Sequence, residues 1–178
     1  ILGRSASVGE IVGKHDERYT TNRIHRLAAS AGITERLGVE VQLPFISRSH
    51  GHLHRHEDGD LEDETWSFSG AGDLITRLRY AVLLDEGRGL GTWSVIAGCK
   101  FPTGRHHVKN SAGEHAEPGI TPGTGSYDLI LGAAWYKSLQ GQALAGGRAS
   151  WPLYFSLTYR ANGPGDEGYR LGNVFQAN

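Results

Sequence analysis

Hydrophobic and polar residues alternate along several stretches of this chain, with the period expected of a β-strand that has two different faces. The segment 38–45 is one example: Val39, Val41, Leu43 and Phe45 share one face, and polar side chains share the other. The same pattern recurs in the segments 27–34, 73–84, 92–101, 126–135, 150–160 and 169–176. About seven strands are therefore predicted, each near the ~9–11 residues with which a tilted strand crosses a bilayer.

The connections between these segments alternate in length. Short ones are predicted at 34–37, 85–89 and 140–142, long polar ones at about 47–65 and 104–125, and an intermediate one at 162–168. Short turns on one side and long loops on the other are typical of outer-membrane barrels. Aromatic residues stand near the ends of the apolar faces, where interfacial girdles form. They are Trp93, Phe101, Tyr127, Trp135, Trp151 and Tyr159.

The fold class predicted from these patterns is all-β: one antiparallel transmembrane β-barrel domain over residues 1–178. A soluble antiparallel barrel or β-sandwich is the alternative, because its inward faces would alternate in the same way. The chain begins without Met and stops inside a predicted strand. We therefore expect it to be part of a longer polypeptide, and seven strands to be an incomplete barrel, since single-chain bacterial barrels have an even number.

Composition narrows the function classes. The chain has 26 Gly, no Met and one Cys among 178 residues, and a formal net charge of −1. One cysteine cannot build a disulfide framework or a thiolate zinc cluster. Near-zero net charge argues against a duplex nucleic-acid binder. No apolar run reaches the ~18 residues of a transmembrane helix, and frequent glycine disfavours helices altogether.

Four short motifs carry a family resemblance. Residues 31–45 read Ala-Gly-Ile-Thr-Glu-Arg-Leu followed by Gly-Val-Glu-Val-Gln-Leu-Pro-Phe. Residues 70–74 read Gly-Ala-Gly-Asp-Leu, residues 100–104 read Lys-Phe-Pro-Thr-Gly, and residues 122–128 read Pro-Gly-Thr-Gly-Ser-Tyr-Asp. In order and spacing these motifs resemble the outer-membrane barrel family named for the meta-pathway of phenol degradation. The resemblance covers about residues 24–140 and leaves the first ~20 residues and the final strands of such a barrel unmatched.

The resemblance implies a β-barrel in the Gram-negative outer membrane, in contact with its lipid, that passes small-molecule solutes passively. It implies no particular substrate and no catalytic residues. A second hypothesis is a scaffold barrel around a protein partner such as a cytochrome, which would need many more than seven strands. A homo-oligomer is also open. The third hypothesis is the soluble β-sandwich binding module.

Charged residues on the polar face are the candidates for lining a wet lumen. They are Glu40, Arg77, Arg79, Lys100, Asp128 and Arg160. Asp73 and Asp128 both follow glycine-rich strand openers, and we expect them to pair with lumen arginines such as Arg77 or Arg79. The mixed signs of these side chains predict no strong preference for anions or cations.

Histidines at alternate positions form the sharpest local feature. His50, His52, His54 and His56 precede six acidic residues within the segment 57–64. Imidazole suits Zn²⁺, Cu²⁺ and Ni²⁺, and in an extended loop the four rings would share one side. The hypothesis is a loop that collects divalent transition metals; the alternative is a solvated, disordered external loop. The second long loop holds His106, His107, Glu114, His115 and Glu117, which could complete such a site.

No enzyme is predicted. The glycines of segment 87–91 lack the strand–turn–helix setting of a nucleotide-binding loop, and no Gly-x-Ser-x-Gly elbow occurs. Cys99 alternates onto the apolar face with Val95 and Phe101, which predicts a small packing residue rather than a nucleophile.

Overall fold

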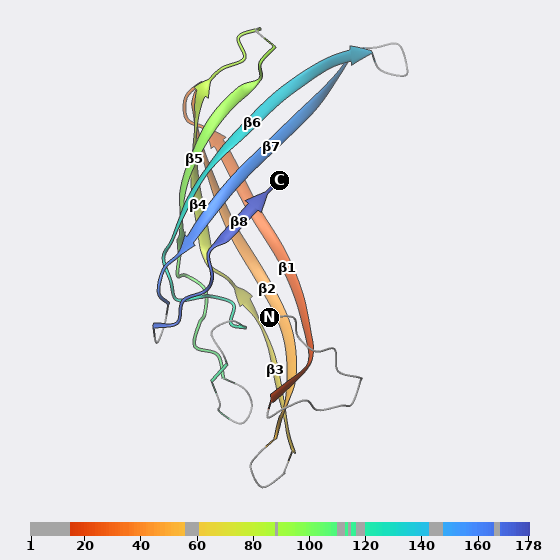
Figure 1. Ribbon diagram of the computed structural model, residues 1–178, viewed down its shortest axis with the longest axis vertical. Coiled ribbons are helices and arrows are strands. Elements are labelled where there is room, and N and C mark those ends of the chain that lie inside the picture. Colours follow the sequence, from red (N-terminus) through yellow and green to blue (C-terminus); the bar gives the residue numbers. More distant parts are fainter. Residues whose placement is uncertain are drawn as a thin grey trace.

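The computed structural model describes residues 15–55, 61–87, 89–109, 113, 115–116, 120–142, 148–165 and 168–178. These ranges hold eight strands and no helix, and every strand pair is antiparallel (Figure 1). The strands are β1 (His15–Gly32), β2 (Leu37–Arg55), β3 (Leu61–Ala71), β4 (Leu74–Leu83), β5 (Thr92–Phe101), β6 (Asp128–Gln142), β7 (Arg148–Asn162) and β8 (Val174–Ala177). No helix long and apolar enough to cross a membrane occurs in them.

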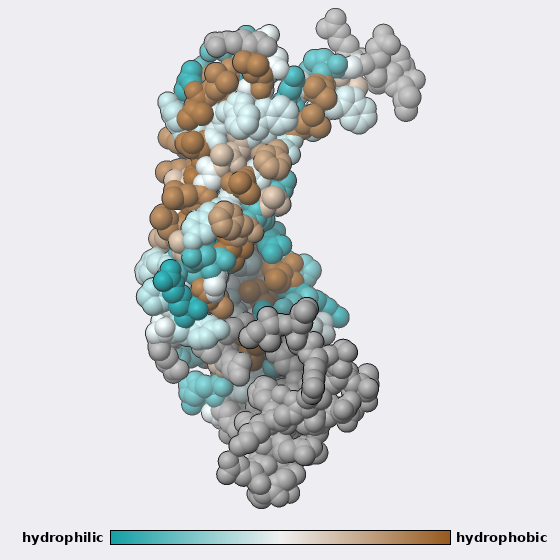
Figure 2. Space-filling view, viewed as in Figure 1, coloured by the Kyte–Doolittle hydropathy of each residue, from teal (hydrophilic) through white to brown (hydrophobic). Residues whose placement is uncertain are grey.

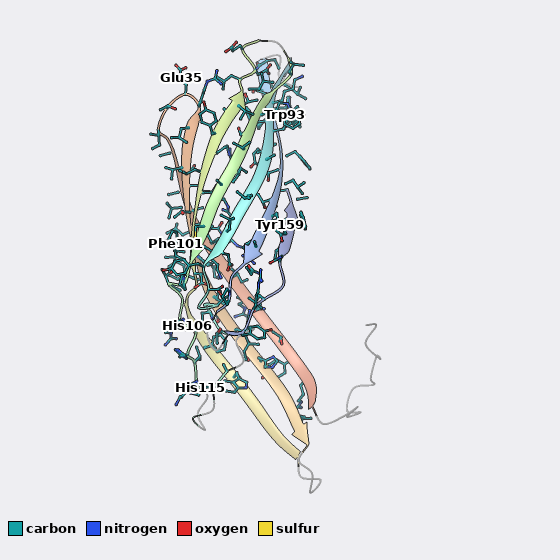
Figure 3. The ribbon with its side chains drawn as sticks, turned by 60° about the vertical axis from the view of Figure 1, so that its left-hand side comes forward. Glu35, Trp93, Phe101, His106, His115 and Tyr159 are labelled. Carbon is teal, nitrogen blue, oxygen red and sulfur yellow. The ribbon has the colours of Figure 1, made fainter. Side chains whose placement is uncertain are left out.

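The strands form one sheet in the order β1-β2-β4-β5-β6-β7-β8, and β3 pairs with the second half of β2. Residues 37–42 of β2 pair with β4, and residues 45–55 pair with β3. Gly72 and Asp73 separate β3 from β4, and the two strands pair with successive parts of β2. The sheet curls into a half-barrel, as Figures 1 and 3 show from two directions. Within the described ranges, β1 and β8 each have a strand partner on one side only.

The prediction of an all-β antiparallel fold is confirmed.

Two predicted connections are wrong. Most of 47–65 is strand, because β2 continues to Arg55 and β3 begins at Leu61, and residues 140–142 belong to β6. The reason is the same in both places: the strands run on beyond the apolar stretch, where both faces are polar and the hydrophobic alternation that marks a strand disappears. Backbone ladders hold these extensions.

The two faces of the half-barrel differ sharply. On β5 the alternation places Ser94, Ile96 and Lys100 on the buried concave side and Trp93 and Val95 on the exposed convex side. The same division holds for β4, β6 and β7. Figure 2 shows brown, hydrophobic residues gathered over the upper part of the molecule, where β4 to β7 lie. The charged residues of these strands therefore lie mostly on the concave side, beside buried apolar residues such as Ile75 and Ile130, and most of the large apolar side chains lie on the exposed convex side.

Between β5 and β6, described residues of the segment 102–127 pack on the concave side of β3. Trp66 and Phe68 of β3 pack there against Ala116, with Val108 and Ile120 around them. The predicted loop 104–125 lies within this segment. A hydrophobic cluster thus holds the segment to the sheet at the end where the long connections lie.

Candidate functional site: the concave face

All six charged residues predicted to line a lumen lie on the concave face. Glu40 stands opposite Arg77 across β2 and β4, and Lys100 stands opposite Asp128 across β5 and β6. Cross-strand partners share a face of the sheet, so these contacts fix the orientation of each pair. The remaining two are Arg79, opposite Ile96, and Arg160, opposite Ile130.

The first ion pair on this face joins Arg77 and Glu40. Arg77 Nη1 lies 2.5 Å from Glu40 Oε1 and also donates to Gln42 Oε1 at 3.2 Å. The two charged side chains are 24% and 32% exposed. A pair this accessible contributes ~0–1 kcal/mol, so its main effect is to neutralise both charges. The expected pairing of an aspartate with a lumen arginine occurs between Asp128 and Arg160. Arg77, one of the two arginines offered as examples, pairs with Glu40 instead because Glu40 stands directly opposite it in the register.

The second cluster surrounds Lys100. Its Nζ lies 3.1 Å from Asp73 Oδ2 and 2.9 Å from Asp128 Oδ2, and all three side chains are at most 5% exposed. Lys100 Nζ also donates to Ser126 Oγ at 3.1 Å and to Thr124 Oγ1. One ammonium thus bridges two buried carboxylates, and we name this group the Lys100 junction. Arg160 Nε, 3.7 Å from Asp128 Oδ2, supplies the second positive charge.

Asp73 ties the segment after β5 to this junction. Its Oδ1 accepts from the Gly104 amide at 3.0 Å, and its Oδ2 accepts from the Thr124 amide at 2.9 Å. Asp128 Oδ1 accepts from Ser126 Oγ at 2.8 Å and from the Gly163 amide at 3.2 Å. Three of the four motifs that carry the family resemblance therefore meet here, at residues 72–74, 100–104 and 122–128.

Glycines allow the close approach behind the junction. A Cβ on Gly104 would lie 2.8 Å from the Gly123 Cα and 2.9 Å from the Gly72 Cα. A Cβ on Gly123 would collide with the Gly104 carbonyl. The backbone segments touch directly, so only glycine fits at these positions.

The residues that sequence reasoning missed surround Arg79. Arg79 Nη2 donates to Tyr154 Oη at 3.1 Å, and its guanidinium carbon lies 5.3 Å from the centre of the Tyr154 ring. A hollow of about 230 Å³ opens beside them. It is lined by Glu40, Gln42, Arg77, Ile96, Ser156, Thr158, Gln176 and Asn178 in addition. The sequence could have indicated Tyr154, because in β7 it alternates onto the same face as Ser156 and Thr158.

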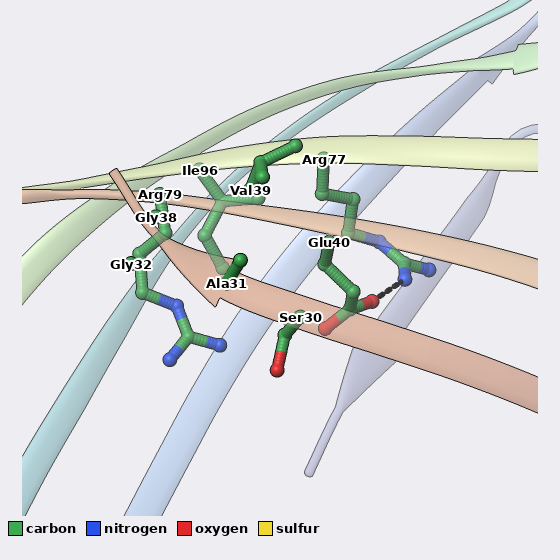
Figure 4. A pocket seen from close by; sticks show the side chains of 9 residues that line it. All are labelled: Ser30, Ala31, Gly32, Gly38, Val39, Glu40, Arg77, Arg79 and Ile96. Carbon is green, nitrogen blue, oxygen red and sulfur yellow. Dashed lines mark hydrogen bonds and ion pairs between the residues drawn. The ribbon is translucent and has the colours of Figure 1, made fainter.

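A neighbouring pocket of about 260 Å³ lies between the ends of β1 and β2 and strands β4 and β5. Figure 4 shows the dashed contact between Arg77 and Glu40 in it, and the Arg79 side chain ending apart from that pair. Arg26 of β1 lines a third hollow together with Arg77 and Arg160.

The histidine prediction falls partly on described residues. His50 is buried on the concave side of β2, and its Nδ1 lies 2.7 Å from Thr20 Oγ1. His52 and His54 lie in β2 opposite Glu64 and Glu62, although their side chains lie outside the described part, as does the whole of His56. The hypothesis of a disordered loop is wrong for residues 50–55, which are strand. Partial burial also lowers the pKa of the nearby Arg48 guanidinium.

The second histidine group is close together. The rings of His106 and His107 are 4.7 Å apart, and those of His107 and His115 are 6.3 Å apart. Figure 3 places His106 and His115 beyond the lower end of β5, beside β3. Glu114 and Glu117 lie outside the described residues. Among the side chains that the structure describes, no group of three His, Cys, Asp or Glu residues is placed to hold a metal ion.

The comparisons with known proteins add nothing to this geometry. No family model and no curated protein matches the chain. The family resemblance of the four motifs stays a prediction.

Proposed function

We propose that this chain forms the wall of a Gram-negative outer-membrane β-barrel through which small molecules pass passively. The convex face carries the argument. Its large apolar side chains are exposed: Leu78 is 51% exposed, Leu129 54% and Phe155 53%. A water-soluble β-sandwich would bury such residues and leave the polar face outside, so the observed arrangement favours a lipid environment.

The dimensions of this apolar surface suit a bilayer. On β5 it runs from Trp93 to Phe101, about 26 Å along the strand at ~3.3 Å per residue. A tilt of ~40° makes this about 20 Å of height, near the ~25 Å apolar band of outer-membrane barrels. Beyond Phe45 the convex positions of β2 become polar, starting with Ser47 and Ser49. The extension of β2 and β3 would then project out of the membrane.

Aromatic residues mark both limits of the apolar band. At one limit Trp93 pairs with Trp135, whose Nε1 donates to the Leu90 carbonyl at 2.9 Å. At the other, Phe101 and Tyr127 pack edge to face with ring centres 6.0 Å apart. Figure 3 shows Trp93 near one end of the sheet, and Phe101 and Tyr159 farther along it. Side chains with an apolar body and a polar tip suit the membrane interface.

Passage of solutes requires a closed wall around the concave face. In the described ranges the outer edges of β1 and β8 carry no strand partner, and closure requires that both edges be paired. The polar lining, with hollows along the concave face, supports a water-filled interior rather than a packed core.

Reconstitution of the native polypeptide tests this proposal. We expect it to need detergent for solubility, to migrate faster on gels when unheated, and to produce discrete conductance steps in planar lipid bilayers. A protein that stays soluble without detergent would overturn the membrane assignment. A heat-modifiable barrel without conductance would instead favour the scaffold function.

A further inference from the structure

We infer that the concave face selects small anions over cations, an inference that rests on the proposed function and names its solute class. Several charges on this face neutralise one another in ion pairs. Glu40 pairs with Arg77, while Asp73 and Asp128 offset Lys100 and Arg160. Between Leu37 and Asn162, these contacts use every concave-face carboxylate whose side chain the structure describes. The expectation of no strong ion preference, drawn from the mixed signs of the lining residues, therefore overlooks which of these charges are paired.

Arg79 and Arg26 stand outside these pairs. In the described part of the chain, neither Arg79 nor Arg26 lies within ion-pair distance of a carboxylate. Arg79 is held by Tyr154, which is neutral, through a hydrogen bond and the face of its ring. Arg26 borders the hollow that also contacts Arg77 and Arg160. Arginine stays protonated in proteins, so both charges persist at any physiological pH.

The surroundings of Arg79 suit an anion. The Tyr154 oxygen accepts from Arg79, which leaves the Tyr154 hydroxyl hydrogen free to donate. Gln176 and Asn178 line the same hollow with amide groups. A guanidinium next to neutral hydrogen-bond donors matches a carboxylate or a halide, and a guanidinium binds a planar carboxylate through two parallel hydrogen bonds. The one carboxylate among the residues that line this hollow, Glu40, is paired with Arg77.

Ion selectivity in bilayers tests the inference directly. With a tenfold gradient of potassium chloride across the membrane, the reversal potential of the native protein should shift toward the chloride potential, showing several-fold preference for chloride. R79Q and R26Q should each reduce that shift, and R79Q/R26Q should abolish it. E40Q should increase it, because it releases the charge of Arg77. Acetate should replace chloride as the permeant anion.

Two further variants show whether the reversal potential depends on where an arginine lies or on the net charge of the protein. Arg23 lies on β1 three residues from Arg26, on the opposite face, so R23Q should leave the reversal potential unchanged. Y154F keeps the ring and removes the hydroxyl, so it should weaken the shift less than R79Q does. Heat-dependent gel migration confirms that each variant folds.

The outcomes distinguish this inference from the function on which it rests. A conducting native protein that prefers potassium, or neither ion, overturns the anion inference and leaves the channel intact. An R23Q effect equal to that of R79Q overturns it as well, because net charge rather than the concave face would then set selectivity. A native protein without conductance overturns both.

Discussion

Lys100 and Asp128 face each other across β5 and β6, with Nζ 2.9 Å from Oδ2, and both side chains are almost completely buried. This pair joins strands that are separated in sequence by the long segment 102–127. Asp73 brings β4 and both ends of that segment into the same network. Buried charges are tolerated because each is paired and hydrogen-bonded. The junction therefore couples the sheet to the segment that folds over its concave side.

Replacing Lys100 by Met should destabilise the protein strongly. K100M keeps the side-chain length but leaves Asp73 and Asp128 as two buried carboxylates without their shared cation. Breaking a buried pair in this way costs about 3–5 kcal/mol. Unfolding by urea in detergent, followed by tryptophan fluorescence, measures the loss. K137M is the matched control, because Lys137 lies outside the junction and donates to the Gly89 carbonyl. Equal losses in the two variants would contradict the role of the junction.

Replacing Gly123 by Ala tests the close backbone approach. The added methyl group would collide with the Gly104 carbonyl, so the segments must separate and strain the bonds to Asp73. Overpacking of this kind costs about 1–3 kcal/mol. Thermal unfolding in detergent should show G123A less stable than G172A, since no atom lies within 4 Å of a Cβ placed on Gly172. Equal melting temperatures would mean that the contact relaxes without cost.

The sheet was predictable from sequence wherever one face is apolar. In β5 and β6 the alternation of Trp93 to Phe101 and of Leu129 to Trp135 identified the strands and the face of Lys100 and Asp128. In β3 the large apolar residues of the concave side are Trp66 and Phe68 alone, and the rest of the strand is mostly polar, so hydrophobic periodicity was too short to identify it. That strand exists because β2 offers it a backbone ladder, a long-range contact that local pattern does not encode.

The sequence predicted which charged residues lie on the concave face, but not which of them pair with each other. Alternation placed Glu40, Arg77 and Asp128 on one face, yet which charge meets which depends on strand register. Register is set by turn geometry and by the interruption at Gly72 and Asp73. The Lys100 junction also needs the return of segment 122–126 over the sheet, which no local motif specifies. For the same reason the excess charge of Arg79 became visible only with the structure.

Removing the Trp66 side chain should release segment 102–127 from β3. Trp66 is 3% exposed and packs with Phe68 and Ala116. Truncation of a buried Trp costs about 3–5 kcal/mol, more than a small satellite cluster supplies. Trypsin should therefore cut W66A faster after Lys109. W151A is the control, because Trp151 is 62% exposed and lies on β7 opposite Leu139, outside the Trp66 cluster. Unchanged cleavage in W66A would show that the Lys100 junction alone holds the segment.

Metal binding by the histidines at positions 50–56 stays a prediction, and calorimetry can test it directly. We expect calorimetry with Zn²⁺ or Cu²⁺ to give a micromolar signal that is lost when His50, His52, His54 and His56 are all replaced by Ala. The alternate spacing in a strand suits this, since residues two apart share a face. Replacing His106, His107 and His115 by Ala serves as the comparison. The absence of heat with the unmodified protein would refute the hypothesis.

An arginine in the centre of the convex face should prevent stable insertion into a bilayer. Leu131 lies midway between Tyr127 and Trp135 on β6 and is 49% exposed. If this face contacts lipid, L131R places a charge near the bilayer midplane, at a cost of about 2–4 kcal/mol. Q176R adds the same charge to the concave side of β8 and should cost far less. Folding into lipid vesicles, scored by heat-dependent gel migration against urea concentration, separates the two variants. If L131R and Q176R fold equally well in vesicles, the exposed apolar face does not contact lipid and some other surface covers it.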